Sequence, residues 1–161
     1  MPKIMTCLWF DMNAEEAVKY YTGIFKNSKV IQVTHYSPSV SKAIGIPAGA
    51  VLTILFQLDG QKYIALNGGP GFKFSEAVSL IILCKTQKEV DYYWRRLAKG
   101  GQEGQCGWLK DKSGFSWQVA PAGMQRWISD KTPRKDDRVL AALLPMKKLI
   151  LKDLERAYKA E

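Results

Sequence analysis

The chain is poor in the residues that bind metals and form cross-links. Its 161 residues include one histidine, His35, and three cysteines, none of which forms a CxxC pair. An odd number of cysteines and an N-terminus without signal-peptide features argue against a disulfide framework. No apolar run approaches the roughly 20 residues that a membrane-spanning helix needs. We therefore expect a cytoplasmic protein with no membrane association.

The three cysteines are expected to lie in different environments. Cys7 and Cys84 lie within or beside apolar runs, which is typical of buried structural thiols. Cys106 lies in the glycine-rich segment 104–108 and could face a cleft.

The charge of the chain raises the question of a nucleic-acid partner. There are 24 Lys and Arg against 15 Asp and Glu, a net charge of +9, and a basic surface attracts phosphate groups. The basic residues are spread along the chain, and we predict no Lys/Arg block with interleaved exposed aromatics. The expectation is a solvated basic surface and no nucleic-acid partner.

Two stretches 73 residues apart repeat one pattern. Residues 6–10 and 79–83 are mainly apolar and of strand length, and Asn13 and Thr86 follow them, each with a glutamate three residues later. This spacing is that of a capping box at a helix N-terminus. Helical spacing then predicts buried residues at equivalent positions of the two helices: Ala17, Tyr20, Tyr21 and Ile24 in the first, and Val90, Tyr93, Trp94 and Leu97 in the second.

Three more strands are expected in the first half. Residues 29–36 alternate as a strand, and residues 37–48 form a loop rich in breakers. Strands 51–58 and 61–67 flank Asp59-Gly60, a strong hairpin signal because both turn positions need positive φ.

The second half follows the same order. Strand 78–83 and helix 87–99 precede a hairpin of residues 106–110 and 115–120. Residues 138–160 are apolar at helical spacing, and Pro145 should break or kink that helix. The sequence thus predicts a single domain of residues 1–161, made of a first βαβββ module (3–67), a connector (68–76), a second βαβββ module (77–121) and a C-terminal helical extension (122–161).

A tandem βαβββ unit resembles the vicinal oxygen chelate superfamily of glyoxalase, bleomycin-resistance and extradiol dioxygenase proteins. Over residues 3–121 the chain is similar to the PhnB-like branch, often labelled a 3-demethylubiquinone-9 3-methyltransferase. The motifs behind this resemblance are WFD with AEEA at residues 9–17, NGGP with FKF at 67–74, and CGWLKDK with SWQ at 106–118. The resemblance implies an α+β fold in which the modules form a curved mixed sheet, and a homodimer.

The resemblance also places metal ligands on the first and last strand of each module. Carried onto this chain, those positions are Thr6, Ala65, Ser79 and Gln118. Divalent metals need converging imidazole, carboxylate or thiolate ligands, and no His, Asp or Glu lies in these strand segments. We expect no metal. Glycines 68–71 lack the GxGxxG spacing of a nucleotide-binding turn, so we expect no other cofactor.

The resemblance implies a pocket inside the curved sheet, where residues alternating with Thr6 and Ser79 would face it. These residues, among them Leu83, are apolar, which predicts an apolar or aromatic small-molecule ligand. The pocket candidates are Thr6, Leu8, Phe10, Asn67, Phe72, Ser79, Ile81, Cys106, Trp108 and Gln118. The alternative is that these side chains simply pack a sheet. Lys110, Asp111 and Lys112 are expected to be solvated in a hairpin turn.

Three functions remain open at this point. The first is a metal-free module that binds a small molecule. The second is a metal-independent enzyme, including the methyltransferase of the family label, that uses Cys106, His35 or an intersubunit carboxylate. A nucleic-acid-binding module is the third.

Overall fold

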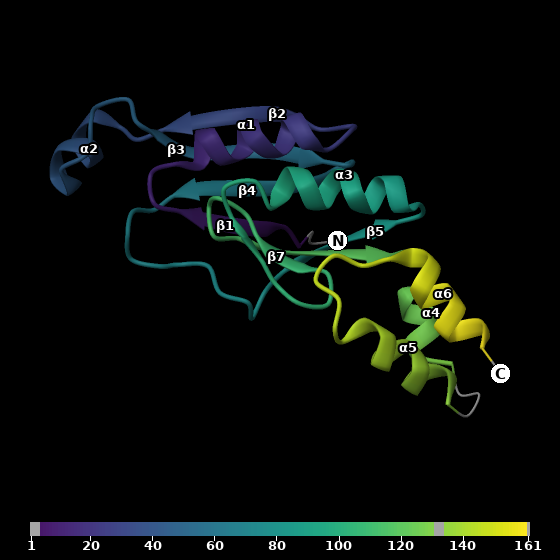
Figure 1. Cartoon of the computed structure of the whole chain (residues 1–161). Helices are drawn as coiled ribbons and strands as arrows, with labels where there is room; N and C mark the ends of the chain where they lie inside the picture. The colour runs from purple at the N-terminus through teal and green to yellow at the C-terminus, as the bar shows by residue number, and fades with distance from the viewer. Residues whose placement is uncertain (1–3, 131–133, 161) are drawn as a thin grey trace. The chain divides into compact units, whose positions relative to one another are not determined.

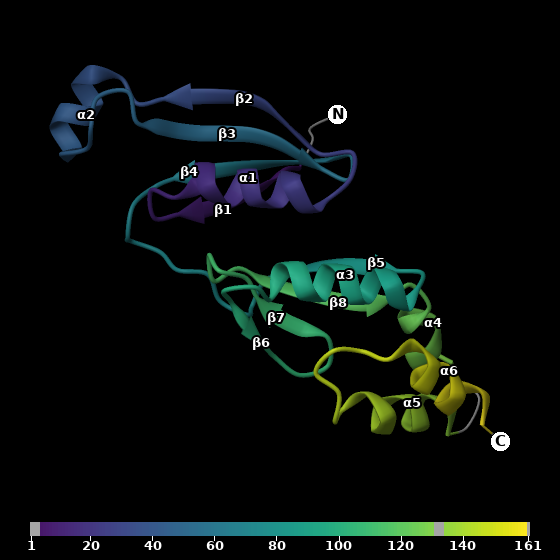
Figure 2. The ribbon, with the colours of Figure 1, turned by 45° about the horizontal axis from the view of Figure 1, so that its top comes forward.

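A computed structural model describes residues 4–130 and 134–160 of the chain. These residues form two compact units, one up to Lys73 and one from Phe74 onward. Each unit contains a four-stranded sheet with one helix packed on it (Figures 1 and 2). The tandem α+β architecture expected from the repeat is confirmed.

The first unit has the expected βαβββ order with one added helix. Its elements are β1 (Thr6–Phe10), α1 (Ala14–Ile24), β2 (Lys29–His35), α2 (Pro38–Ile44), β3 (Val51–Leu58) and β4 (Gln61–Asn67). The strand order is β1-β4-β3-β2, with β1 parallel to β4 and the other pairs antiparallel. Asp59 and Gly60 both have positive φ, so the predicted hairpin turn is confirmed.

The second unit repeats this order and adds a helical tail. Its elements are β5 (Leu80–Cys84), α3 (Gln87–Leu97), β6 (Gln102–Glu103), β7 (Trp108–Lys110), β8 (Ser116–Pro121), α4 (Met124–Ile128), α5 (Lys135–Leu143) and α6 (Leu151–Lys159). The strand order β5-β8-β7-β6 matches that of the first sheet strand for strand. Short β6 is the strand of the second βαβββ module for which no range was predicted, and α4 lies within the predicted helical extension.

Both long helices bury the face that helical spacing predicts. Ala17, Tyr21 and Ile24 of α1 are buried, as are Val90, Trp94 and Leu97 of α3. The equivalent tyrosines, Tyr20 and Tyr93, are only half-buried at the edge of each stripe. The two helices therefore use equivalent positions to cover their sheets.

The N-termini of the two helices are capped differently. Thr86 and Glu89 form the predicted capping box on α3. Asn13 makes no side-chain cap on α1, contrary to the expectation. Instead, the Ala14 amide donates to Oδ1 of Asn67 at 2.9 Å, and Asn67 Nδ2 donates to Glu15 and to the Val51 carbonyl. A strand residue from the end of the module thus caps the first helix.

Two local expectations in the first unit are corrected. Residues 37–48 contain α2, because Pro38 suits the first turn of a helix, the Ser37 hydroxyl accepts from the Val40 amide, and Gly45 ends the helix in the left-handed conformation. Cys7 is exposed rather than buried, since it lies on the face of β1 that α1 does not cover. Cys84 is buried as expected.

The tail forms a small core of its own. Val139, Leu149 and Leu154 are buried together, and the interruption between α5 and α6 contains Pro145, as predicted. Backbone bonds from Cys106 to Met146 and from Gly107 to Lys147 join the tail to the segment before β7. In the part of the chain that the structure describes, no helix has the length and apolar character to cross a membrane.

Candidate functional site

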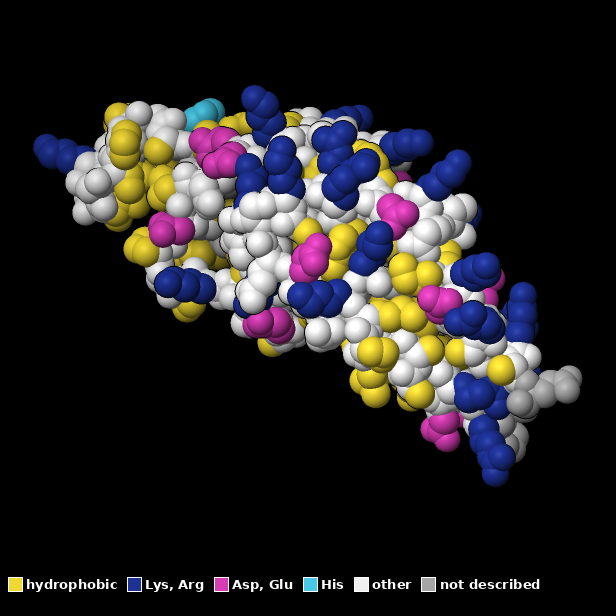
Figure 3. Space-filling view, in the orientation of Figure 1, with side chains coloured by type: hydrophobic (Ala, Val, Ile, Leu, Met, Phe, Trp, Pro, Cys, Tyr) yellow, Lys and Arg dark blue, Asp and Glu magenta, His cyan; other side chains and the backbone are white. Residues whose placement is uncertain are grey.

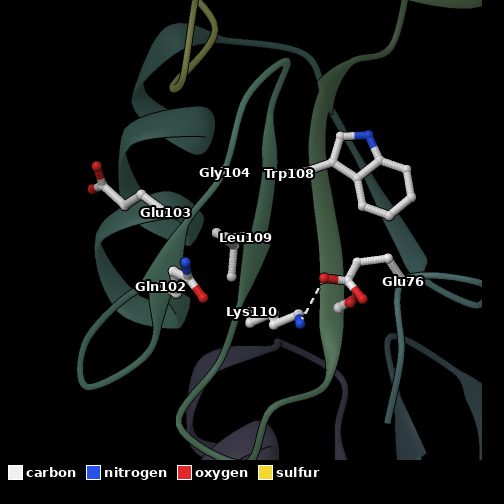
Figure 4. A pocket seen from close by; sticks show the side chains of 8 residues that line it. Glu76, Gln102, Glu103, Gly104, Trp108, Leu109 and Lys110 are labelled. Atoms are coloured by element: carbon white, nitrogen blue, oxygen red, sulfur yellow. Dashed lines mark ion pairs between the residues drawn. The ribbon is translucent and has the colours of Figure 1, made fainter.

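A hollow of about 130 Å³ lies in the second unit on the sheet formed by β6, β7 and β8 (Figure 4). It is lined by Glu76, Gln102, Glu103, Gly104, Trp108, Leu109, Lys110 and Ser116. Trp108 and Lys110 alternate along β7 and lie on one face, whereas Leu109 between them is buried on the other. Because α3 packs on the Leu109 side, the indole and the ammonium group lie on the face opposite the helix.

An ion pair forms one side of the hollow. Lys110 Nζ lies 2.6 Å from Glu76 Oε1, and Figure 4 shows Lys110 directed toward Glu76. The hydrogen bond from Lys110 holds the pKa of the Glu76 carboxyl below its usual value. The Glu76 carboxyl therefore stays ionised at neutral pH. The expectation that Lys110 is solvated in a turn is corrected, since it lies in β7.

The Ser116 hydroxyl is a buried group without a partner in the described residues. Ser116 is fully buried, and its Oγ makes no hydrogen bond there. It pairs with Lys110 across β7 and β8, so its side chain lies on the same face as the ion pair. A buried hydroxyl without a partner costs about 1–3 kcal/mol, and a ligand in the hollow that hydrogen-bonds to it would remove that cost.

Four of the expected pocket residues lie together on this face. Trp108 and Ile81 both pair with Gln118 in the sheet register, and Gln118 Nε2 donates to Ser79 Oγ at 2.9 Å. Ile81 is 55% exposed, and Leu83 on the same face is also exposed. Sequence alternation missed Lys110 and Ser116, although each lies two residues from a predicted site residue.

The expected register of the first strand is shifted by one residue. Thr6, Leu8 and Phe10 pair with Tyr63, Ala65 and Asn67. Since the Asn67 side chain caps α1, this whole row lies on the helix-covered face. Leu8 and Phe10 are only 3% and 2% exposed. They are core residues, and Asn67 is a buried capping residue; Cys7 and Trp9 occupy the opposite face.

Phe72 and the glycines of the connector surround Trp9. Phe72 is exposed and contacts the Trp9 ring edge-on, with 4.9 Å between centroids. Trp9 Nε1 donates to the Gly69 carbonyl at 2.9 Å. A Cβ on Gly68 would lie 2.2 Å from the Trp9 ring. Close packing of an indole therefore accounts for glycine at position 68.

Asp111 is buried, contrary to the expectation of a solvated turn. Its Oδ1 accepts from the Ser113 and Phe115 amides, and its Oδ2 accepts from Trp117 Nε1 at 2.7 Å. Trp117 is itself 2% exposed. The motif that contains Asp111 and Trp117 thus holds the β7–β8 hairpin together from within.

The residues considered for covalent or acid–base chemistry are not assembled into a site. The Cys106 thiol lies against the carbonyls of Leu143 and Leu144 at the end of α5. His35 is exposed at the end of β2. Cys7, which was predicted to be a structural thiol, is exposed, but partial desolvation raises the pKa of its thiol, which reduces its thiolate fraction and hence its nucleophilicity at neutral pH.

The metal positions implied by the resemblance do not offer suitable donors. Ala65 is buried beneath α1, Ser79 and Gln118 bond to each other, and Thr6 has only a hydroxyl. Within residues 4–130 and 134–160, no three His, Cys, Asp or Glu side chains are grouped so as to hold a metal ion. These donor groups do not fit a divalent metal.

Comparisons with known proteins identify the family and the fold of the chain. The family model described as 3-demethylubiquinone-9 3-methyltransferase matches residues 2–120. A Bacillus cereus protein of that description, a PhnB protein, is 32% identical, with a TM-score of 0.65 over 73% of this chain and 98% of its own. A search of curated proteins finds no match.

More distant structures share the fold alone. A Pseudomonas aeruginosa protein is 17% identical, with a TM-score of 0.60 over 75% of this chain and 98% of its own. The fosfomycin resistance protein FosX from Listeria monocytogenes, in complex with Mn(II) and sulfate, is 14% identical, with a TM-score of 0.51 over 78% of this chain and 97% of its own. The chain has the fold of the vicinal oxygen chelate superfamily and belongs to its PhnB-like family, described as 3-demethylubiquinone-9 3-methyltransferase.

Proposed function

We propose that this protein binds a small apolar or aromatic molecule, without a metal, on the face of the second sheet opposite α3. The observation behind this proposal is the hollow beside Trp108, which contains the unpartnered hydroxyl of Ser116. An aromatic wall with a few polar groups is the usual composition of a small-molecule site. Exposed Ile81 and Leu83 extend the apolar surface along β5.

The polar groups of the hollow define what such a ligand needs. A flat ring would pack on Trp108, and one hydrogen-bonding substituent would reach Ser116. The Lys110–Glu76 ion pair offers both a positive and a negative group. It would therefore orient a polar substituent without selecting for either a cationic or an anionic ligand. The Trp94 indole fixes the Glu103 side chain, since Trp94 Nε1 donates a hydrogen bond to Glu103 Oε1 at 2.8 Å.

The methyl donor implied by the family label does not fit the glycines that could have held it. Nucleotide-containing cofactors need a glycine-rich turn whose amides approach phosphate or ribose groups closely. Here the Trp9 ring occupies the space next to Gly68, and the Gly69 carbonyl accepts a hydrogen bond from the indole. No step through a methyl donor is therefore proposed.

The proposal is tested by a screen of aromatic fragments against the purified full chain, with binding followed by heteronuclear NMR. Ligands that shift Trp108 should lose about tenfold or more in affinity in Trp108→Leu, since one buried ring contact is worth at least 1.4 kcal/mol. Ser116→Ala should weaken only the ligands that have a hydrogen-bonding substituent. Phe72→Leu, an exposed ring in the other unit, is the matched control. Fragments that bind equally well to all three variants would contradict the proposal.

Location and assembly are part of the same proposal. Three free cysteines suit a reducing compartment, which supports a cytoplasmic protein. Exposed Ile81 and Leu83 alternate on one face of β5, and they offer an apolar surface that a second copy could cover, as in the homodimer that the resemblance implies. Light scattering on Leu83→Lys against wild type tests this, and an unchanged dimer or a monomeric wild type would contradict it.

A further inference from the structure

The outer face of α3 gathers basic residues that are separated in the sequence. At 100° per residue, Lys88 and Arg95 fall on one stripe of α3 with Arg96 beside them, opposite the buried Val90, Trp94 and Leu97. Lys85 lies just before the helix and Lys99 just after it. All five basic side chains are exposed. We call them the α3 basic stripe. Figure 3 shows Lys and Arg side chains projecting to solvent in the region of this helix.

The two acidic residues of α3 offset only part of the charge of the five basic residues, and the Asp91 carboxylate interacts electrostatically with Arg95. Asp91 is paired with Lys148 of the tail at 2.6 Å and accepts from Gln87. Glu89 accepts from the amides of Lys85 and Thr86 as part of the helix cap. Among the described residues, no salt bridge joins Lys88, Arg95 or Lys99 to a carboxylate.

The helix itself does not account for these charges. Arg95 and Arg96 lie in the last turn, where cations interact favourably with the helix dipole. Lys85 and Lys88 lie at the opposite end, where the dipole disfavours them. A solvated helix is usually stabilised by acid–base pairs four residues apart. Helix α3 has one, Asp91 with Arg95, and its remaining basic side chains outnumber its acidic ones.

An aromatic pair lies within the stripe. Tyr92 is half-buried, its ring contacts Tyr93 at 5.1 Å between centroids, and Arg96 Cζ lies 5.5 Å from the Tyr92 centroid. Cations in a row beside an aromatic ring are the elements with which proteins hold single-stranded nucleic acids, through phosphate contacts and base stacking. No large aliphatic side chain lies on the stripe, so an inserted lipid surface is a poorer match.

We propose that the α3 basic stripe binds the phosphate backbone of a single-stranded nucleic acid, with Tyr92 as a stacking platform. Within α3, from Lys88 to Arg96, the stripe extends about 12 Å at 1.5 Å per residue. Lys85 and Lys99 continue it beyond the two ends of the helix, so the whole stripe can reach roughly three or four phosphates. This surface belongs to α3, and the hollow lies on the other face of the sheet, so the two proposals fail or succeed separately.

Fluorescence anisotropy of a labelled mixed-sequence 20-nucleotide single strand, with the full chain, tests this proposal. Four neutralised phosphates predict a slope near −3 in log affinity against log salt, because each contributes about −0.7. Affinity should therefore fall about 50-fold between 50 and 200 mM KCl. Absence of binding at 50 mM KCl would overturn the proposal.

Matched charge variants separate the stripe from net charge. Lys88→Glu with Arg95→Glu should weaken binding by more than about tenfold and flatten the slope. Lys152→Glu with Arg156→Glu, on the exposed face of α6, makes the same change in net charge and should weaken it less than about threefold. Equal loss in both double variants would overturn the proposal, as would stripe-dependent binding to phosphatidylserine vesicles without binding to the oligonucleotide. If the charge-reversed variant unfolds, Lys88→Gln with Arg95→Gln replaces it, with the same expected order.

Tyr92→Leu tests the stacking contribution. It should weaken binding to the single strand several-fold while leaving binding to a duplex of the same sequence unchanged, because only unpaired bases are free to stack. An equal effect on both would overturn the assignment of Tyr92.

Discussion

At the scale of single residues, Gly68 shows that a glycine-rich segment can exist for packing. A Cβ there would lie 2.2 Å from the Trp9 ring, whereas one on Gly71 would meet nothing within 4 Å. Gly68→Ala should lower the free energy of unfolding by about 1–3 kcal/mol, since overpacking displaces the indole, and Gly71→Ala should change it by less than about 0.5 kcal/mol. Urea unfolding of both variants measures this, and equal stabilities would contradict it.

Cys84 makes stability depend on alkaline pH. Burial, with a smaller effect of the Glu89 charge, raises the pKa of its thiol to about 12, above the ~8.5 of an unfolded cysteine. Between these values the folded protein keeps a proton that the unfolded chain releases, so this group's contribution to stability falls as pH rises. From pH 9 to 11, wild type should lose stability faster than Cys84→Val. Parallel curves in urea titrations would show that the thiol ionises equally in both states.

At the scale of secondary-structure elements, helix α1 is capped by Asn67, a residue distant in the sequence, and not by the adjacent Asn13. Asn67→Ala should cost about 2–3 kcal/mol, because it leaves the Ala14 amide without its acceptor and removes the Asn67 donor from the partly buried Val51 carbonyl. Asn13→Ala should cost less than about 0.5 kcal/mol, because its side chain makes no cap. Chemical denaturation of the pair tests this, and a larger loss for Asn13→Ala would restore the capping box expected from sequence.

The elements that were predicted correctly are those determined by local signals. The Asp59-Gly60 turn needs positive φ at both positions, and the Thr86–Glu89 box is satisfied within four residues. The register of β1 was mispredicted because residues 6–10 are mainly apolar on both faces. What determines it is non-local: the pairing of β1 with β4 and the Asn67 contact with α1.

In the second unit, the part of the candidate site that lies on regular strands was predictable from the sequence. Ser79, Ile81, Trp108 and Gln118 share a face because period-two alternation holds along β5, β7 and β8. Glu76 could not have been found this way, since it precedes β5 in the irregular connector and reaches Lys110 only in the folded unit. A search for runs of basic residues also misses the α3 basic stripe, because its residues are separated in the sequence and share a face only once the helix forms.

At the scale of the whole molecule, the two units share a strand order and differ in what surrounds it. The hollow and the helical tail both belong to the second unit. Gln87 joins the tail to α3, since its side chain donates to the Leu149 carbonyl and accepts from the Leu151 amide. The two units therefore share a core architecture and differ in their surface chemistry.

The side chains at the four expected metal positions predict how the melting temperature responds to metal ions. Binding to the folded state alone raises the melting temperature, but Thr6, Ala65, Ser79 and Gln118 lack donors suited to a divalent ion. A tenfold excess of Mn²⁺, Ni²⁺ or Zn²⁺, or of EDTA, should therefore shift the melting temperature by less than about 1 °C. Ser79→His with Gln118→Glu installs an imidazole and a carboxylate at two positions whose side chains already meet, since Gln118 Nε2 lies 2.9 Å from Ser79 Oγ. This variant should gain a metal-dependent rise in melting temperature. Stoichiometric metal in purified wild type, with a melting temperature that EDTA lowers, would show instead that ligands outside these four positions hold an ion.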